Sequence, residues 1–138
     1  MTLYEPRPVP TKLSLIGLGG SVSGNVRAEV IVVQNKSELE TLGDKIKGKI
    51  VCYNHDWVRY GDSSDYRVWG ASWAAKYGAS AVLVRSVTPE SIYSVHAGNM
   101  HYLPNITQIP VAAITVEDAE MFQRMQDRGQ KIVVHLIL

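Results

Sequence analysis

The sequence predicts a mixed α/β domain, because segments typical of strands alternate with segments typical of helices along its 138 residues. Two adjoining stretches carry this prediction. After a turn at Gly48, residues 49–53 form a short run that ends in four apolar side chains, as expected of a strand covered on both faces. Residues 65–77 then place bulky aromatic side chains at helical spacing and stop before Gly78, a residue type that commonly ends helices.

The composition fits one globular domain and argues against several classes of partner. Hydrophobic residues make up 46% of the chain and charged residues 20%, which is ordinary for a folded domain of this length. The net charge of +1 provides no basic field for nucleic acid, and the longest apolar runs have the length of strands rather than of membrane spans. We therefore expect neither nucleic acid nor a membrane among its partners.

The two ends of the chain suggest a piece of a longer polypeptide. Residues 1–10 contain three prolines, which favour an extended linker, so we place the folded domain at residues 11–138. Residues 131–138 have the pattern of a strand with no polar tail behind it. Such an ending is expected of a segment taken from a longer protein.

The first part of the domain predicts two strands around a glycine-rich loop. Residues 13–16 are a short strand candidate, and residues 26–33 turn from alternating to continuously apolar, as in a strand that enters the core. The loop at residues 17–24 has glycines like those of a dinucleotide-binding motif, but a strand rather than a helix follows it. We therefore expect these glycines to serve turns and not to bind a nucleotide.

A short helix and a buried strand come next. Ser37 and Glu40 have the spacing of a capping box, which predicts a helix over residues 38–43 with Ser37 as its N-cap. The buried strand over residues 49–53 follows, and the polar and aromatic residues 54–64 predict a loop.

The helix over residues 65–77 combines aromatic residues on one face with small residues that would let its backbone lie close to a sheet. The aromatic residues are Tyr66, Trp69, Trp73 and Tyr77, and the small ones are Gly70, Ala71, Ala74 and Ala75. We expect the aromatic face to belong to the core, with a docking surface for a neighbouring domain as the alternative.

The last elements repeat the alternation of strand and helix. Residues 79–86 and 109–115 are nearly continuous apolar strands, separated by a long loop over residues 87–108. Thr115, as N-cap, begins a third helix over residues 116–128. The terminal strand then completes the α/β pattern.

No set of residues is spaced for catalysis or for metal binding. Cys52 and His55 would suit a nucleophile and its base, but they are expected on opposite faces of one strand, with the thiol buried. His96 and His101 lack the spacing of a helical zinc site, and His135 lies in the terminal strand. We therefore expect no catalytic residue and no metal site in this chain.

Several motifs, in order along the chain, resemble the protease-associated domain. They are Lys-Gly-Lys-Ile-Val (47–51), Ala-Ala-Lys-x-Gly-Ala (74–79), the apolar strand 81–84, Ile-Pro-Val-Ala (109–112) and Ile-Thr-Val-Glu-Asp-Ala (114–119). Further motifs are similar to the version of this domain that is inserted in carboxypeptidase Q-like zinc peptidases of family M28. These are Tyr-Asn (53–54), Arg-Ser-Val (85–87), Ser-Ile-Tyr-Ser-x-His-x-Gly (91–98) and Ile-Thr-Val-Glu-Asp-Ala-Glu-Met (114–121).

The resemblance implies both a fold and a role. The fold is a β-rich core, part sandwich and part barrel, flanked by two or three helices. The role is that of a non-catalytic lid and protein-interaction module beside a di-zinc catalytic domain, with zinc in the parent chain and no cofactor in this one. The catalytic domain and a peptide substrate are then the partners, and the secretory pathway, the lysosome or the extracellular space is the location. A free-standing peptide- or protein-binding module of the sorting-receptor type is the alternative.

The long loop over residues 87–108 is the best functional candidate, since loops of this length in compact domains are often functional. Its similarity to the family pattern is greatest at residues 91–98. The resemblance therefore implies the hypothesis that Tyr93, Ser94 and His96 face the catalytic cleft, with a solvated loop as the alternative.

Two glycosylation sequons are present, Asn35-Lys-Ser and Asn105-Ile-Thr. Because Ser37 is expected to cap a helix, Asn35 is the weaker candidate. Asn105 lies in the long loop and is the stronger one.

Overall fold

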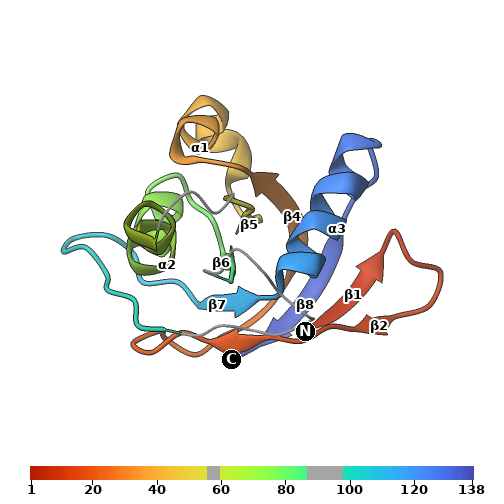
Figure 1. The fold of residues 1–138 in the computed structure, drawn as a ribbon, viewed down its shortest axis with the longest axis horizontal. Coiled ribbons are helices and arrows are strands. Elements are labelled where there is room, and N and C mark those ends of the chain that lie inside the picture. Colours follow the sequence, from red (N-terminus) through yellow and green to blue (C-terminus); the bar gives the residue numbers. More distant parts are fainter. Residues whose placement is uncertain (56–59, 87–97) are drawn as a thin grey trace.

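The computed structural model describes residues 1–55, 60–86 and 98–138 (Figure 1). Its strands are β1 (Thr2–Glu5), β2 (Thr11–Lys12), β3 (Ile16–Gly17), β4 (Asn25–Val33), β5 (Ile50–Tyr53), β6 (Ala81–Arg85), β7 (Val111–Ile114) and β8 (Val133–Ile137). Its helices are α1 (Lys36–Leu42), α2 (Tyr60–Ala75) and α3 (Val116–Asp127), and a short 3-10 helix, η1 (Gly43–Ile46), follows α1.

The eight strands form one sheet in the order β2-β1-β8-β4-β5-β6-β7-β3. The central strands β4 to β7 run parallel, and the outer strands pair antiparallel. The sheet is curled like half a barrel. At its end, the Leu18 N–H donates to the Val111 carbonyl at 3.2 Å, and the side chain of Leu138 lies beside Gly17 of β3.

Side chains of the central strands alternate between two hydrophobic clusters, one on each face of the sheet. In β5, Ile50 and Cys52 belong to the cluster that contains α3, whereas Val51 and Tyr53 belong to the cluster that contains α1 and α2. Figure 1 shows α3 on one side of these strands and α1 with α2 on the other. Burial on both faces explains the continuous apolar runs. The predicted mixed α/β class, with a curled, barrel-like sheet and flanking helices, is confirmed.

The prediction of a linker over residues 1–10 is wrong for the residues before the first proline, Pro6. Thr2–Glu5 forms β1, which pairs with β8, and Leu3 is fully buried against the α3 face. The physical reason is that β8 would otherwise be the edge of the sheet, with its backbone groups unpaired and its core face uncovered. The strand candidate at residues 13–16 is also corrected, because β2 ends before it and β3 shares only its last residue, Ile16.

The N-cap predicted for the first helix is wrong by two residues. Asn35, not Ser37, caps α1: its Oδ1 accepts a hydrogen bond from the Glu38 N–H at 2.9 Å. The Glu38 carboxylate in turn accepts from the Gln34 N–H at 2.6 Å. Both Asn35 and Ser37 are followed three residues later by a glutamate, and the structure uses the earlier pair.

The cap of α3 is as predicted, since Thr115 Oγ1 accepts from the Asp118 N–H at 3.0 Å. The aromatic helix differs from its prediction at both ends. It begins at Tyr60, within the segment predicted as a loop, and ends at Ala75. Tyr77 therefore belongs to the turn that leads to Gly78, whose φ of +89° is the left-handed conformation suited to glycine.

Candidate functional site

The long loop that carries the predicted site is described only in its second part. Tyr93, Ser94 and His96 lie outside the described residues. The described part, residues 98–108, runs along α2. There the His101 N–H donates to the Val68 carbonyl at 3.0 Å, and the Leu103 N–H donates to Ser72 Oγ at 2.9 Å. Helix α2 therefore holds this part of the loop in place.

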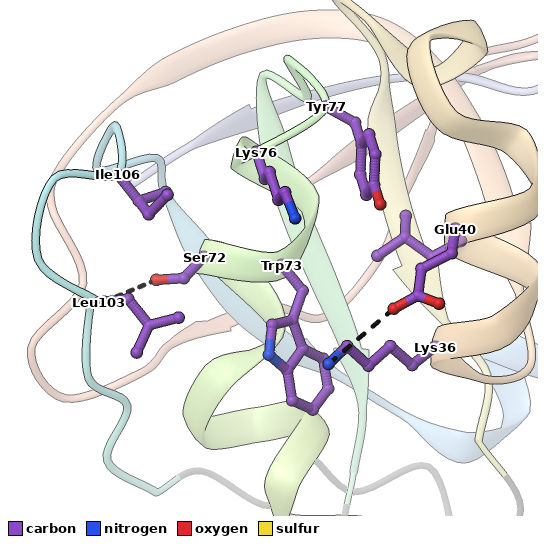
Figure 2. Close-up of a pocket in the computed structure, with 9 residues that line it drawn as sticks. Lys36, Glu40, Ser72, Trp73, Lys76, Tyr77, Leu103 and Ile106 are labelled. Carbon is purple, nitrogen blue, oxygen red and sulfur yellow. Dashed lines mark hydrogen bonds and ion pairs between the residues drawn. The ribbon is translucent and has the colours of Figure 1, made fainter.

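A pocket of about 220 Å³ lies where this part of the loop meets α1 and α2 (Figure 2). It is lined by Lys36, Leu39, Glu40, Ser72, Trp73, Lys76, Tyr77, Leu103 and Ile106. Figure 2 shows that three segments contribute: α1, the end of α2 with the turn after it, and the loop.

The pocket brings an aromatic ring, charged side chains and a hydroxyl group together. The Trp73 indole is half-buried, and Lys36 Nζ lies 4.6 Å from the centre of its ring, within the range of a cation–π contact. Lys36 Nζ also lies 4.0 Å from the Glu40 carboxylate. The buried Ser72 hydroxyl is already used as an acceptor by the loop backbone. The pocket thus combines apolar and aromatic walls with charged groups from α1 and from the turn after α2.

The aromatic face of α2 is only partly in the core. The side chains of Tyr66, Trp69 and Trp73, and of Tyr77 in the turn after the helix, remain partly exposed, whereas Gly70, Ala71 and Ala74 are buried against the sheet. The small residues thus hold the position nearest the sheet, as predicted, and displace the aromatic rings to the sides. Tyr66 links the two regions: its ring centre lies 5.4 Å from that of Tyr53 and 5.6 Å from that of Trp73.

A cluster of polar side chains lies at the carboxyl ends of the parallel strands. No role was assigned to these residues from the sequence. The Arg85 side chain is only 9% exposed and reaches the Glu120 carboxylate at 3.5 Å. Its Nη1 donates to Asn54 Oδ1 at 3.0 Å, and the Asn54 amide contacts Gln123 Oε1 at 3.4 Å. Asn54 and Arg85 belong to two of the motifs that carry the family resemblance. The sequence does contain a signal for this cluster, since Asn54 and Arg85 are polar residues directly at the ends of buried strands.

This edge of the sheet is where α/β proteins commonly bind ligands. The chain from Ser86 onward, at the end of β6, leads into the segment with Tyr93, Ser94 and His96. The polar cluster therefore includes Arg85, one of the last described residues before that segment.

The side chains of Cys52 and His55 lie on opposite faces of the sheet. Cys52 is fully buried in the α3-side cluster, and burial raises the pKa of its thiol from 9.0 to about 12. His55 stacks on Tyr66 with 4.3 Å between ring centres, and its Nδ1 lies 3.0 Å from the Gln34 carbonyl. The thiol is neutral and inaccessible, and the imidazole lies on the other face of the sheet. Cys52 and His55 therefore cannot act together as a nucleophile and its base.

Among the described residues, no group of three or more histidine, cysteine, aspartate or glutamate side chains is arranged to hold a metal ion. His135 Nε2 lies 2.5 Å from Asn25 Oδ1, and His101 packs against Trp69 at 5.9 Å between ring centres. His96 lies outside the described chain. No helix within the described ranges is both long enough and apolar enough to cross a membrane.

The two sequon asparagines differ in their surroundings. Asn35 is partly buried and its side chain caps α1. Asn105 is exposed, in a turn with a φ of +62°. Asn105 is therefore the more accessible of the two asparagines.

Comparison with known proteins gives consistent relatives for the whole chain. No family model matches the sequence. Carboxypeptidase Q from Xenopus laevis is 51% identical over 137 residues, the protein of that name from Mus musculus 47% and that from Homo sapiens 45%. Each match covers 97% of this chain but 29% of the relative. The chain therefore spans less than a third of the length of the curated relatives that it matches.

Solved structures support the same relationship. The crystal structure of a peptidase M28 precursor from Shewanella amazonensis matches with a TM-score of 0.87 and 25% identity, covering 99% of this chain and 33% of that one. A zinc aminopeptidase from Bacillus subtilis shares the fold at a TM-score of 0.63 and 20% identity, over 99% of this chain and 30% of its own.

Proposed function

We propose that this chain, which is homologous to one region of carboxypeptidase Q, is the non-catalytic protease-associated module of a zinc peptidase of family M28. One observation carries the proposal: the match covers 97% of this chain and only 29% of the relative. The chain thus corresponds to one part of a longer enzyme. In this proposal the zinc ions and their ligands belong to the rest of that enzyme.

The chemistry of the described residues supports a non-catalytic role. The one cysteine is buried with a raised thiol pKa, and its nearest histidine in sequence lies across the strand. The pocket between α1 and α2 has binding character. This chain would therefore assist the active site of its neighbour by shaping access to it and by contacting protein.

The long loop is the part of the chain that we assign to substrate access. Tyr93, Ser94 and His96 would face the cleft of the neighbouring catalytic domain and contact a peptide substrate. Two features of the described residues support this role. The loop begins at the polar edge of the sheet beside Arg85, and its second part is held on α2 through Ser72.

The family resemblance also supports a location in the secretory pathway, with the lysosome or the extracellular space as the destination. The sequons at Asn35 and Asn105 are compatible with that route.

A free-standing module that captures peptides or proteins is the second candidate function. The pocket beside Trp73, with lysines at its rim, favours it. The flanking gene sequence distinguishes the two. A His-x-Asp zinc motif downstream supports the peptidase module, whereas a transmembrane segment supports the receptor.

The direct test of the non-catalytic assignment is a dipeptide hydrolysis assay of the 138-residue chain, with and without added zinc, beside the Cys52→Ser variant. We expect no turnover above the buffer rate in any of these samples. Turnover that requires zinc or the Cys52 thiol would contradict the proposal.

A further inference from the structure

A groove of about 380 Å³ lies between α3 and the turn that joins β1 to β2, and the proposed function does not use it. It is lined by Pro6, Arg7, Pro8, Met121, Arg124, Met125, Arg128 and Gln130. Figure 1 shows this turn beside α3, on the opposite side of the sheet from α1 and α2. The groove is therefore distinct from the pocket of Figure 2.

Three arginines concentrate positive charge in this groove. Arg7, Arg124 and Arg128 are all exposed, and no acidic residue is among the lining residues. Across the described parts of the chain, none of the three forms an ion pair. Since the whole chain has a net charge of only +1, this clustering is a local feature rather than a consequence of a basic protein.

The helix dipole accounts for part of this arrangement. Arg124 lies in the last turn of α3 and Arg128 at its C-cap, where a positive charge is favourable. It does not account for Arg7, which comes from a different element. Arg7 Nη2 lies 3.3 Å from Met121 Sδ, so its guanidinium is held on the same face of the helix. Three like charges brought together from two elements favour an anionic partner.

The floor of the groove indicates which kind of anion it fits. Met121, which is partly exposed, supplies an adaptable thioether side chain beside the buried Met125, and Pro6 and Pro8 supply rigid apolar walls. Guanidinium groups form bidentate hydrogen bonds with carboxylates, and methionines accommodate varied apolar side chains. A polyanion such as a nucleic acid or a sulfated polysaccharide would instead need an extended basic surface.

From this combination we infer that the groove binds an acidic polypeptide segment in which carboxylate residues alternate with apolar ones. The carboxylates contact Arg7, Arg124 and Arg128, and the apolar side chains lie on Met121, Pro6 and Pro8. This inference does not depend on the peptidase assignment, because it rests on the other face of the sheet.

The probe for the test is a short synthetic peptide of alternating glutamate and leucine, titrated into the 138-residue chain with ¹³C-labelled methionine methyl groups. We expect the methyl signals of Met121 and Met125 to shift. The signal of Met100, which is buried in the cluster on the other face, should stay unchanged. A matched peptide with glutamine in place of glutamate should bind much more weakly, and added salt should weaken binding of the acidic peptide.

Two pairs of variants separate this groove from general charge attraction. The Arg124→Gln/Arg128→Gln variant should lose about tenfold or more in affinity, the equivalent of one charge-assisted contact. The Lys45→Gln/Lys47→Gln variant removes the same charge from exposed lysines elsewhere and should bind like the original chain. Equal loss in both variants, unchanged Met121 and Met125 signals, or tighter binding of heparin than of the peptide would overturn the inference.

Discussion

Tyr53 and Gly70 join the sheet to α2 through a close contact. The Tyr53 hydroxyl donates a hydrogen bond of 2.7 Å to the Gly70 carbonyl, and both residues are buried. A Cβ atom placed on Gly70 would lie 2.7 Å from a carbon of the Tyr53 ring. Only a glycine lets the helix backbone come this near, so the small-residue face of α2 is a requirement of the contact.

We expect the Gly70→Ala substitution to destabilise the domain by about 1–3 kcal/mol, because the added methyl group forces the ring or the helix to move. This direction is opposite to the usual effect of alanine in a helix, where it is favoured over glycine by up to about 1 kcal/mol. Urea unfolding measures the change. Gly17→Ala is the control, since a Cβ there would meet only Leu138 at an ordinary 3.4 Å. Equal stability of the two variants would contradict the contact.

Because Asn35 is the N-cap of α1, two nearby alanine variants should differ in their stability. Asn35→Ala should cost about 1 kcal/mol of unfolding free energy, because it leaves the Glu38 N–H without its acceptor. Ser37→Ala lies inside the helix and should change stability by less than about 0.5 kcal/mol. If Ser37→Ala were the more damaging of the two, the capping box would belong to Ser37 after all.

Burial of the Cys52 thiol predicts a loss of stability in alkali. Its pKa is about 12 in the folded chain and 9.0 in the reference state, so the unfolded chain releases this proton first. The neutral thiol makes its full contribution to the free energy of unfolding below pH 9, and this contribution is lost between pH 9 and pH 12. The loss is about 1.4 kcal/mol per pH unit for this group, and burial raises the pKa of Tyr53 in the same direction.

Denaturant unfolding of the original chain and of Cys52→Ala across this pH range measures the thiol's share. The variant has a cavity penalty that does not depend on pH, so the stability difference between the two should narrow as the pH rises. A difference that stays constant would show that the thiol does not titrate in this way.

The two sequons predict unequal glycosylation in a protein produced through the secretory pathway. Asn105 is exposed in its turn, whereas Asn35 is partly buried and occupied as a helix cap. Intact-glycopeptide mass spectrometry should therefore find Asn105 occupied to the greater extent. Both asparagines bare in the secreted protein would reject this assignment and weaken the proposed location.

Local signals in the sequence predicted much of this fold because the central strands and α3 depend on local causes. Residues 81–84 of β6 are apolar throughout because both faces of that strand are covered, and Thr115 caps α3 through its own side chain. The cap of α1 could not be assigned in this way, since Asn35 and Ser37 offer the same local pattern. A long-range contact accompanies the earlier choice: the Lys36 N–H donates to the Tyr66 hydroxyl at 3.1 Å.

Features that depend on distant parts of the chain could not be predicted locally. Strand β1 exists because Leu3 covers the core beside Val134 of β8, from the other end of the sequence. The contacts of Arg85 with Asn54 and Glu120 likewise join three elements. The sequence identifies each of these residues as a polar side chain at the end of a strand or on a helix. Only the order of the strands in the sheet shows that the three side chains are in contact.

The claim that this chain assists a neighbouring active site is tested most directly by steady-state kinetics of the longer zinc peptidase that we propose contains it. The variant is Tyr93→Ala/His96→Ala, with Lys45→Ala as a control at an exposed residue far along the chain from the loop. The account predicts that KM for a dipeptide rises by about tenfold, equivalent to about 1.4 kcal/mol of lost substrate binding, while the zinc content stays unchanged. KM and kcat values equal to those of the unsubstituted enzyme would contradict it.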